Sequence, residues 1–128
     1  MKNSLSLCFA LLAAFLLSSC GDSHDKLMKD QLAWTQDVTE VLEKVASGDM
    51  SASDAAEKMQ KLGEEGEDFV KRKEALNKDV DPEELKKVAE KYQDEMMEAI
   101  SAMMKAMMEV QASGKMTPEL QGALGNMK

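Results

Sequence analysis

Apolar residues recur at intervals of three and four along most of this 128-residue chain, and this spacing restricts the fold to packed α-helices. Between residues 25 and 46 the apolar positions are Leu27, Trp34, Val38, Val41, Leu42 and Val45. An α-helix makes one turn about every 3.6 residues, so these side chains share one face of a helix. No segment alternates polar and apolar residues in the manner of a half-buried strand. The sequence therefore predicts an all-α fold.

A second helix is predicted to begin at a serine N-cap, either Ser51 or Ser53. Its seam consists of Ala55, Met59, Leu62, Gly66, Phe69, Lys73 and Leu76. Glycine inside a helix costs about 1 kcal/mol relative to alanine, so the helix is either continuous or broken at Gly63. The seam stays in phase across both glycines, which favours the continuous helix. In that helix Gly66 would admit a bulky neighbour such as Trp34.

Two proline-containing motifs mark the starts of two further helices. In Asp81-Pro82-Glu83-Glu84 the aspartate is an N-cap and the proline takes the first helical position, where no N–H is needed. This helix is predicted to run to Ala112, and Thr117-Pro118-Glu119 opens a short final helix. Over residues 25–128 the segments predict a small antiparallel three-helix bundle with a short fourth C-terminal helix.

The first 20 residues have the three parts of a secretion signal. Lys2 supplies the positive charge, an apolar run extends from Leu5 to Leu17, and two serines precede Cys20. The run is too short for a membrane helix, which needs about 20 apolar residues. Leu17-Ser18-Ser19-Cys20 resembles the lipobox of bacterial lipoproteins.

The resemblance to bacterial lipoproteins implies a signal peptide over residues 1–19 that is cleaved off, and a covalent lipid with acyl chains such as palmitate on Cys20. Residues 20–24 would then form a lipidated tether, and several acyl chains make such an attachment effectively permanent. Gly21 stands where enteric-type lipoproteins of the inner membrane have aspartate, which favours the outer membrane. We therefore expect a protein of the bacterial cell envelope that is lipid-anchored and faces the periplasm.

Acidic residues outnumber basic ones, and this balance excludes one class of partner. Removing residues 1–19 takes away Lys2 and no acidic residue, which leaves 15 of the 16 basic side chains against all 24 acidic ones. This negative charge repels nucleic acid, so nucleic-acid binding is excluded. Cys8 would leave with the leader and Cys20 would carry lipid. The folded part would then have no disulfide, and its stability must come from helix packing.

The sequence has no constellation of residues suited to catalysis. Nucleophilic catalysis needs a fixed base, and His24, the single histidine, is expected to lie in the tether, where nothing fixes its geometry. Acidic residues crowd a glycine-flanked stretch around which no apolar pocket is expected: Glu64, Glu65, Glu67 and Asp68. They are interpreted as a solvated acidic patch, with weak cation binding as the alternative. The prediction is a protein that is not an enzyme and has no cofactor or resident metal.

The helix predicted from Pro82 to Ala112 carries more apolar surface than one core needs. Its first stripe consists of Leu85, Val88, Ala89, Tyr92, Met96, Ala99, Ile100, Met103, Met107 and Val110. A second stripe beside it consists of Met97, Met104 and Met108. Together they span roughly 200°, whereas packing on a single core takes somewhat over about 100°. Something must cover the excess.

Three covers for this methionine-rich face are considered. The final helix can fold back so that Leu120 and Leu124 lie over Met104 and Met108. A protein partner or a second copy can cover the face, because flexible thioether side chains fill imperfect apolar contacts. A soft metal ion such as Cu(I) can be held by methionine pairs one helical turn apart, either 104 with 108 or 103 with 107. The candidate residues for a partner or a metal are Met97, Met103, Met104, Met107 and Met108.

The leading hypothesis is a lipid-anchored envelope lipoprotein that acts as a non-enzymatic interaction or structural module. The alternative is a soft-metal binder or copper chaperone that uses the methionine-rich helix. The partner, the oligomeric state and any ligand are left open by the sequence.

Overall fold

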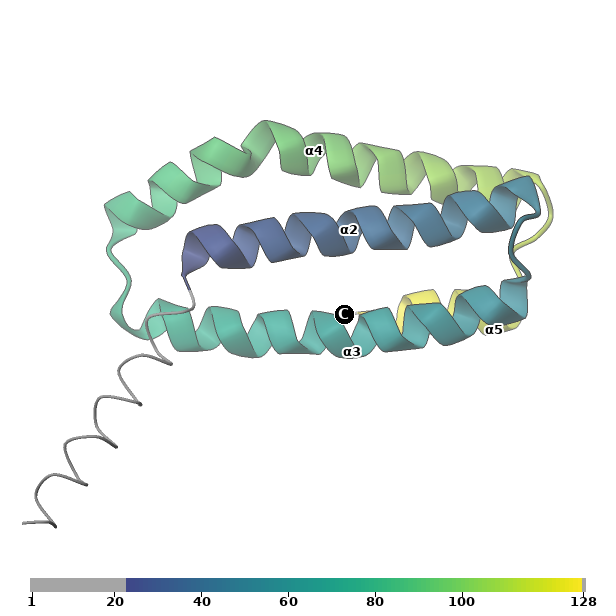
Figure 1. The fold of residues 1–128 in the computed structure, drawn as a ribbon, viewed down its shortest axis with the longest axis horizontal. Coiled ribbons are helices and arrows are strands. Elements are labelled where there is room, and N and C mark those ends of the chain that lie inside the picture. The colour runs from purple at the N-terminus through teal and green to yellow at the C-terminus, as the bar shows by residue number, and fades with distance from the viewer. Residues whose placement is uncertain (1–22, 128) are drawn as a thin grey trace, which may run out of the picture.

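The computed structural model describes residues 23–127, and this part of the chain is all-α, as the apolar spacing predicts (Figure 1). Its elements are α2 (His24–Ser47), α3 (Ala52–Leu76), the 3-10 helix η1 (Asn77–Asp79), α4 (Pro82–Ala112) and α5 (Pro118–Gly125). The predicted leader, the lipobox and Cys20 lie outside the described residues. None of the described helices combines the length and the hydropathy that a bilayer-spanning segment requires.

Side-chain caps fix where three of the helices begin. The hydroxyl of Ser51 accepts a hydrogen bond from the backbone N–H of Asp54, which decides between the two predicted serine caps. The carboxylate of Asp81 accepts from the N–H of Glu83 at the start of α4. Thr117 caps α5 through its hydroxyl in the same way. The starts predicted from the cap and proline motifs are confirmed.

Helix α3 is continuous across both of its interior glycines, as its seam predicts. Gly66 has the predicted role: a Cβ built there would lie 3.4 Å from Cζ2 of Trp34. Gly63 similarly faces Met127, whose Cγ would lie 3.6 Å from such a Cβ. Glycine at these two positions lowers the helix propensity of α3, but the absence of a side chain allows neighbouring segments to approach closely.

Helix α2 lies between α3 and α4 and contacts both (Figure 1). It runs antiparallel to α3 and parallel to α4. Two contacts mark the parallel pair: Lys91 binds Asp25 near the start of α2, and Lys115, beyond α4, donates to the carbonyl of Ala46 near its end. No Cα of α3 comes within 8 Å of a Cα of α4. Helix α2 therefore packs against both α3 and α4, whose backbones do not approach each other closely.

The final helix α5 packs against α3, and none of its Cα atoms comes within 8 Å of a Cα of α4. The prediction that it folds back over Met104 and Met108 is therefore wrong. Leu120 of α5 is fully buried in the same apolar cluster as Met59 of α3. The small residues Ala55 and Ala56 also lie in this cluster, so α3 offers a surface on which a short helix can lie close.

The core lies toward the end of the molecule where α2 ends and α3 begins, and all four described helices contribute to it. Its buried members are Val38, Val41, Leu42, Val45, Ala55, Ala56, Met59, Ala106, Val110, Leu120 and Ala123. Thr35 and Thr39 of α2 are also buried, and each hydroxyl donates to the carbonyl four residues earlier. Among the described residues, no buried side-chain nitrogen or oxygen lacks a hydrogen-bond partner.

Candidate functional site

The five methionines singled out in the sequence divide between two environments. Met103 and Met107 are partly buried and pack against the core. Met97, Met104 and Met108 are 60%, 58% and 60% exposed. The paired thioethers at 103 and 107 therefore serve packing, whereas the pair at 104 and 108 faces solvent. The structure does not bring the five sulfur atoms to one site.

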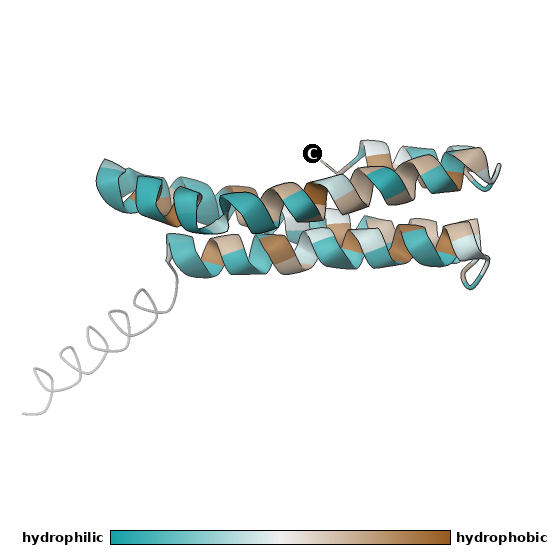
Figure 2. Cartoon of the chain, turned by 90° about the horizontal axis from the view of Figure 1, so that it is seen from above, coloured by the Kyte–Doolittle hydropathy of each residue, from teal (hydrophilic) through white to brown (hydrophobic). Residues whose placement is uncertain are grey.

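The exposed methionines lie on the side of α4 that is turned away from the core. The buried positions of α4 are Tyr92, Ala99, Ala106 and Val110. At about 100° per residue, Met97 and Met104 lie roughly opposite the alanines at 99 and 106. Figure 2 shows the first part of α4 as largely hydrophilic, with the apolar positions collected further along the helix.

Three members of the first predicted stripe are exposed instead of buried. Leu85 and Ala89 lie near the start of α4, where α3 does not approach closely enough to cover them. Ile100 is 42% exposed, because it is one helical step of about 100° beyond the buried Ala99. With Met97, Met104 and Met108 it forms a continuous apolar surface, which we call the α4 face.

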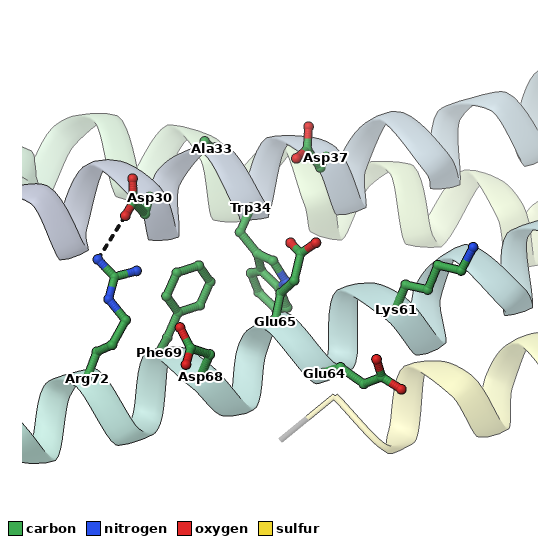
Figure 3. Close-up of a pocket in the computed structure, with 10 residues that line it drawn as sticks. All are labelled: Asp30, Ala33, Trp34, Asp37, Lys61, Glu64, Glu65, Asp68, Phe69 and Arg72. Atoms are coloured by element: carbon green, nitrogen blue, oxygen red, sulfur yellow. Dashed lines mark hydrogen bonds and ion pairs between the residues drawn. The ribbon is translucent and has the colours of Figure 1, made fainter.

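An acidic cleft of about 640 Å³ opens between α2 and α3 (Figure 3). Its lining residues are Asp30, Ala33, Trp34, Asp37, Lys61, Glu64, Glu65, Asp68, Phe69 and Arg72. Three of the four residues of the predicted acidic patch, Glu64, Glu65 and Asp68, therefore line a cleft that also contains two aromatic rings, and Glu67 does not line it. The sequence did not predict this cleft, whose walls combine charged side chains with the rings of Trp34 and Phe69.

Trp34 is held in the cleft by three local features. Its ring packs edge to face on Phe69, with ring centroids 6.2 Å apart and ring planes at 83°. Its Nε1 donates to the backbone carbonyl of Leu62 at 2.7 Å. This carbonyl lies one turn before Gly66, where no side chain blocks the approach of the indole. The glycine, the carbonyl and the indole therefore fit as one unit.

Arg72 occupies one end of the acidic cleft. Its guanidinium donates to Asp30 across the helix pair at 2.9 Å and lies 5.7 Å from the centroid of the Phe69 ring. The remaining lining carboxylates come mainly from α3 (Figure 3). No serine, cysteine or histidine lines the cleft. In the part of the chain that the structure describes, no three His, Cys, Asp or Glu side chains are grouped to hold a metal ion.

The first turn of α2 is fixed to the other helices, which corrects the predicted extent of the tether. Ser23 is the N-cap, so the helix includes His24. His24 Nε2 donates to Oδ1 of Asn77 at 3.1 Å. Asp25 accepts from Lys91 Nζ at 2.7 Å and from the Tyr92 hydroxyl at 3.1 Å. The histidine was expected to be unconstrained, but the fold begins early enough to give it a partner.

The contact between Asp25 and Lys91 should add stability at neutral pH that is lost in acid. The hydrogen bond from Lys91 holds the pKa of Asp25 below its ordinary value of 3.8. The contact therefore contributes its full stabilisation above the ordinary pKa of an aspartate, and this stabilisation declines as the pH falls through the lowered pKa of Asp25. Asp25→Asn should lower the free energy of unfolding at about pH 6, and this loss should shrink below about pH 4.

Urea unfolding of the parent and Asp25→Asn at several pH values measures this effect. Glu43→Gln is the matched control, because it neutralises an exposed carboxylate on the same helix. A difference between parent and Asp25→Asn that stays constant down to about pH 3 would contradict the assignment.

No protein-family model, no curated protein and no solved structure matches the chain.

Proposed function

We propose that this chain is a lipid-anchored lipoprotein of the bacterial cell envelope, held on the periplasmic side of the outer membrane. It acts as a non-enzymatic interaction or structural module, built from three long helices that alternate in direction along the chain, with α5 as the short fourth helix. The observation that carries the proposal is the α4 face, an exposed apolar surface on a strongly acidic protein. A surface of this kind is typical of a contact with another macromolecule.

The acidic cleft offers no histidine-activated nucleophile. Its lining combines carboxylates, two aromatic rings, one lysine and one arginine. The single histidine, the usual base beside a serine or cysteine nucleophile, lies at the start of α2, bonded to Asn77, and does not line the cleft. The cleft is lined mainly by charged side chains, whereas the α4 face is apolar and has no partner within the described fold.

The position of Cys20 supports attachment close to one end of the bundle. Only Gly21 and Asp22 separate it from Ser23, the N-cap of α2. Three residue steps span at most about 11 Å, so a lipid on Cys20 would hold the start of α2 beside the membrane. The same end contains η1 and the first turn of α4 (Figure 1). The bundle would then be closely attached and not suspended on a long linker.

Metabolic labelling with a fatty-acid analogue tests the lipid anchor directly. The full-length chain should be labelled and should fractionate with membranes, and Cys20→Ser should lose both properties. Cys8→Ser is the matched control and should keep both, because this cysteine would leave with the leader. An unlabelled parent chain, or a parent chain in the soluble fraction, would overturn the anchor.

A further inference from the structure

The α4 face has a pattern that fits a second copy of itself. Its exposed apolar members Met97, Ile100, Met104 and Met108 follow one side of α4 over about three turns. We propose that two copies of this chain associate through their α4 faces, with the two α4 helices antiparallel. The inference rests on the proposed role as an interaction module and names its partner, but it does not depend on the lipid.

In the antiparallel arrangement, side chains of one copy face side chains of the other copy in layers. With the two-fold axis between residues 102 and 103, Met97 faces Met108 of the second copy. Ser101 then faces Met104, and the same two layers repeat on the other side of the axis. Each layer contains at least one methionine, and the two central layers combine a large side chain with a small one, as packed helix pairs require.

The charges beside the α4 face are complementary in this register. Glu98 and Lys105 flank the face on the same side, two turns apart, and both are exposed. The antiparallel pairing sets Glu98 of each copy beside Lys105 of the other, which gives two attractive pairs. On the opposite side, Ile100 lies beside the partly buried Met107 of the second copy. Charges and apolar side chains therefore fall on separate flanks.

A parallel pairing lacks this match. In that arrangement each residue of the face meets its own equivalent, and the flanking residues pair one turn apart. Lys105 would then lie beside Ile100 of the second copy, and Glu98 beside Gln93. No opposite charges meet, and an ammonium group is placed against an apolar side chain. The charge pattern therefore favours the antiparallel pair.

Membrane attachment would strengthen this contact and set its orientation. A single helix face gives a small interface, and confinement of both copies to one surface raises their effective concentration. Helix α2 is parallel to α4 and begins near Lys91, so the two starts of α2 lie toward opposite ends of the dimer, roughly 40 Å apart along the helix axes. A lipid at each end would hold the dimer lengthwise along the membrane.

Cysteine crosslinking of the full-length chain tests both the association and its register. In Met97→Cys/Met108→Cys the two positions of one chain lie about 16 Å apart along α4, too far for a disulfide within the chain. Across the antiparallel pair they face each other. After mild oxidation, the double variant should migrate as a dimer on a non-reducing gel. Met97→Cys alone, Met108→Cys alone and the parent chain, with its own Cys8 and Cys20, should remain monomeric.

Charge reversal tests the register of the pair within the same crosslinking assay. In the double-cysteine background, Glu98→Lys should lower the crosslinked fraction by about fivefold, because two attractive pairs become repulsive. Adding Lys105→Glu should restore it, because the pairs are then reversed and attractive again. The exposed positions of all four substitutions leave the core intact.

Several outcomes would overturn the inference. A dimer from Met97→Cys alone would indicate parallel pairing, and no dimer from any variant would exclude self-association through α4. A crosslinked fraction that does not respond to Glu98→Lys would exclude the register. Membrane and soluble fractions are analysed separately. A soluble chain would overturn the lipid anchor, while the crosslinking result in that fraction would still decide the pairing.

Discussion

Leu120→Ala should lower the free energy of unfolding by about 3 to 4 kcal/mol, because it leaves a cavity in the core that all four described helices share. Leu120 is fully buried, with 0% of its surface exposed, and lies in the cluster that includes Met59 of α3 and Val110 of α4. Helix α5 has only eight residues, too few to be stable in isolation. Loss of its main buried side chain should therefore also release α5 from α3.

Urea unfolding followed by circular dichroism measures the stability loss, and hydrogen exchange over residues 118–125 measures the release of α5. Leu124→Ala is the matched control, because it removes the same atoms from a partly buried position on the same helix. It should cost clearly less, about 1 to 2 kcal/mol. Equal losses for the two variants, or unchanged exchange in α5, would contradict the packing of α5 described above.

Helix boundaries were predictable because they depend on short-range chemistry. A cap side chain bonds an N–H two or three residues away, so Ser51 and Asp81 act whatever the helices pack against. The continuity of α3 was predictable for a related reason. Its seam keeps one phase across Gly63 and Gly66, and a break would have separated the apolar side chains on either side.

The neighbour of α5 was not predictable from periodicity. An apolar stripe shows which side of a helix is buried, but both α3 and α4 have apolar sides that a short helix could cover. The choice depends on close approach, which small residues permit. Ala55 and Ala56 of α3 are fully buried beside Leu120, although alanine contributes little to a hydropathy pattern. The signal available in the sequence was this alanine pair one turn before Met59.

The candidate site was predictable only in part. The excess of apolar surface on α4 was visible, and Met97, Met104 and Met108 are indeed exposed. The acidic cleft was missed because its walls come from two helices, and no pattern within one helix reports on their spacing. Trp34 and Phe69 both lie on the seams of their helices. Side chains on a seam can line a cleft at the edge of a contact as well as fill its centre.

Trp34→Ala should lower the free energy of unfolding by about 3 kcal/mol, because three features of the contact between α2 and α3 are lost together. The edge-to-face contact with Phe69 disappears, and the carbonyl of Leu62 loses the hydrogen bond from the indole N–H. A gap also opens over Gly66. Trp34→Phe is the matched control. It retains an aromatic ring but no N–H, so it should cost about 1 to 2 kcal/mol, as judged by urea unfolding.

Gly66→Leu separates the fit at this glycine from the general loss of a large side chain. In the parent it should destabilise by about 1 to 3 kcal/mol, because a Cβ would already stand 3.4 Å from the indole and the larger side chain must displace it. In the Trp34→Ala background the leucine enters the vacated space and removes an interior helical glycine, which favours the helix by about 1 kcal/mol. The two substitutions should therefore couple by more than about 1 kcal/mol, whereas additive losses would show that Gly66 is not there to admit the indole.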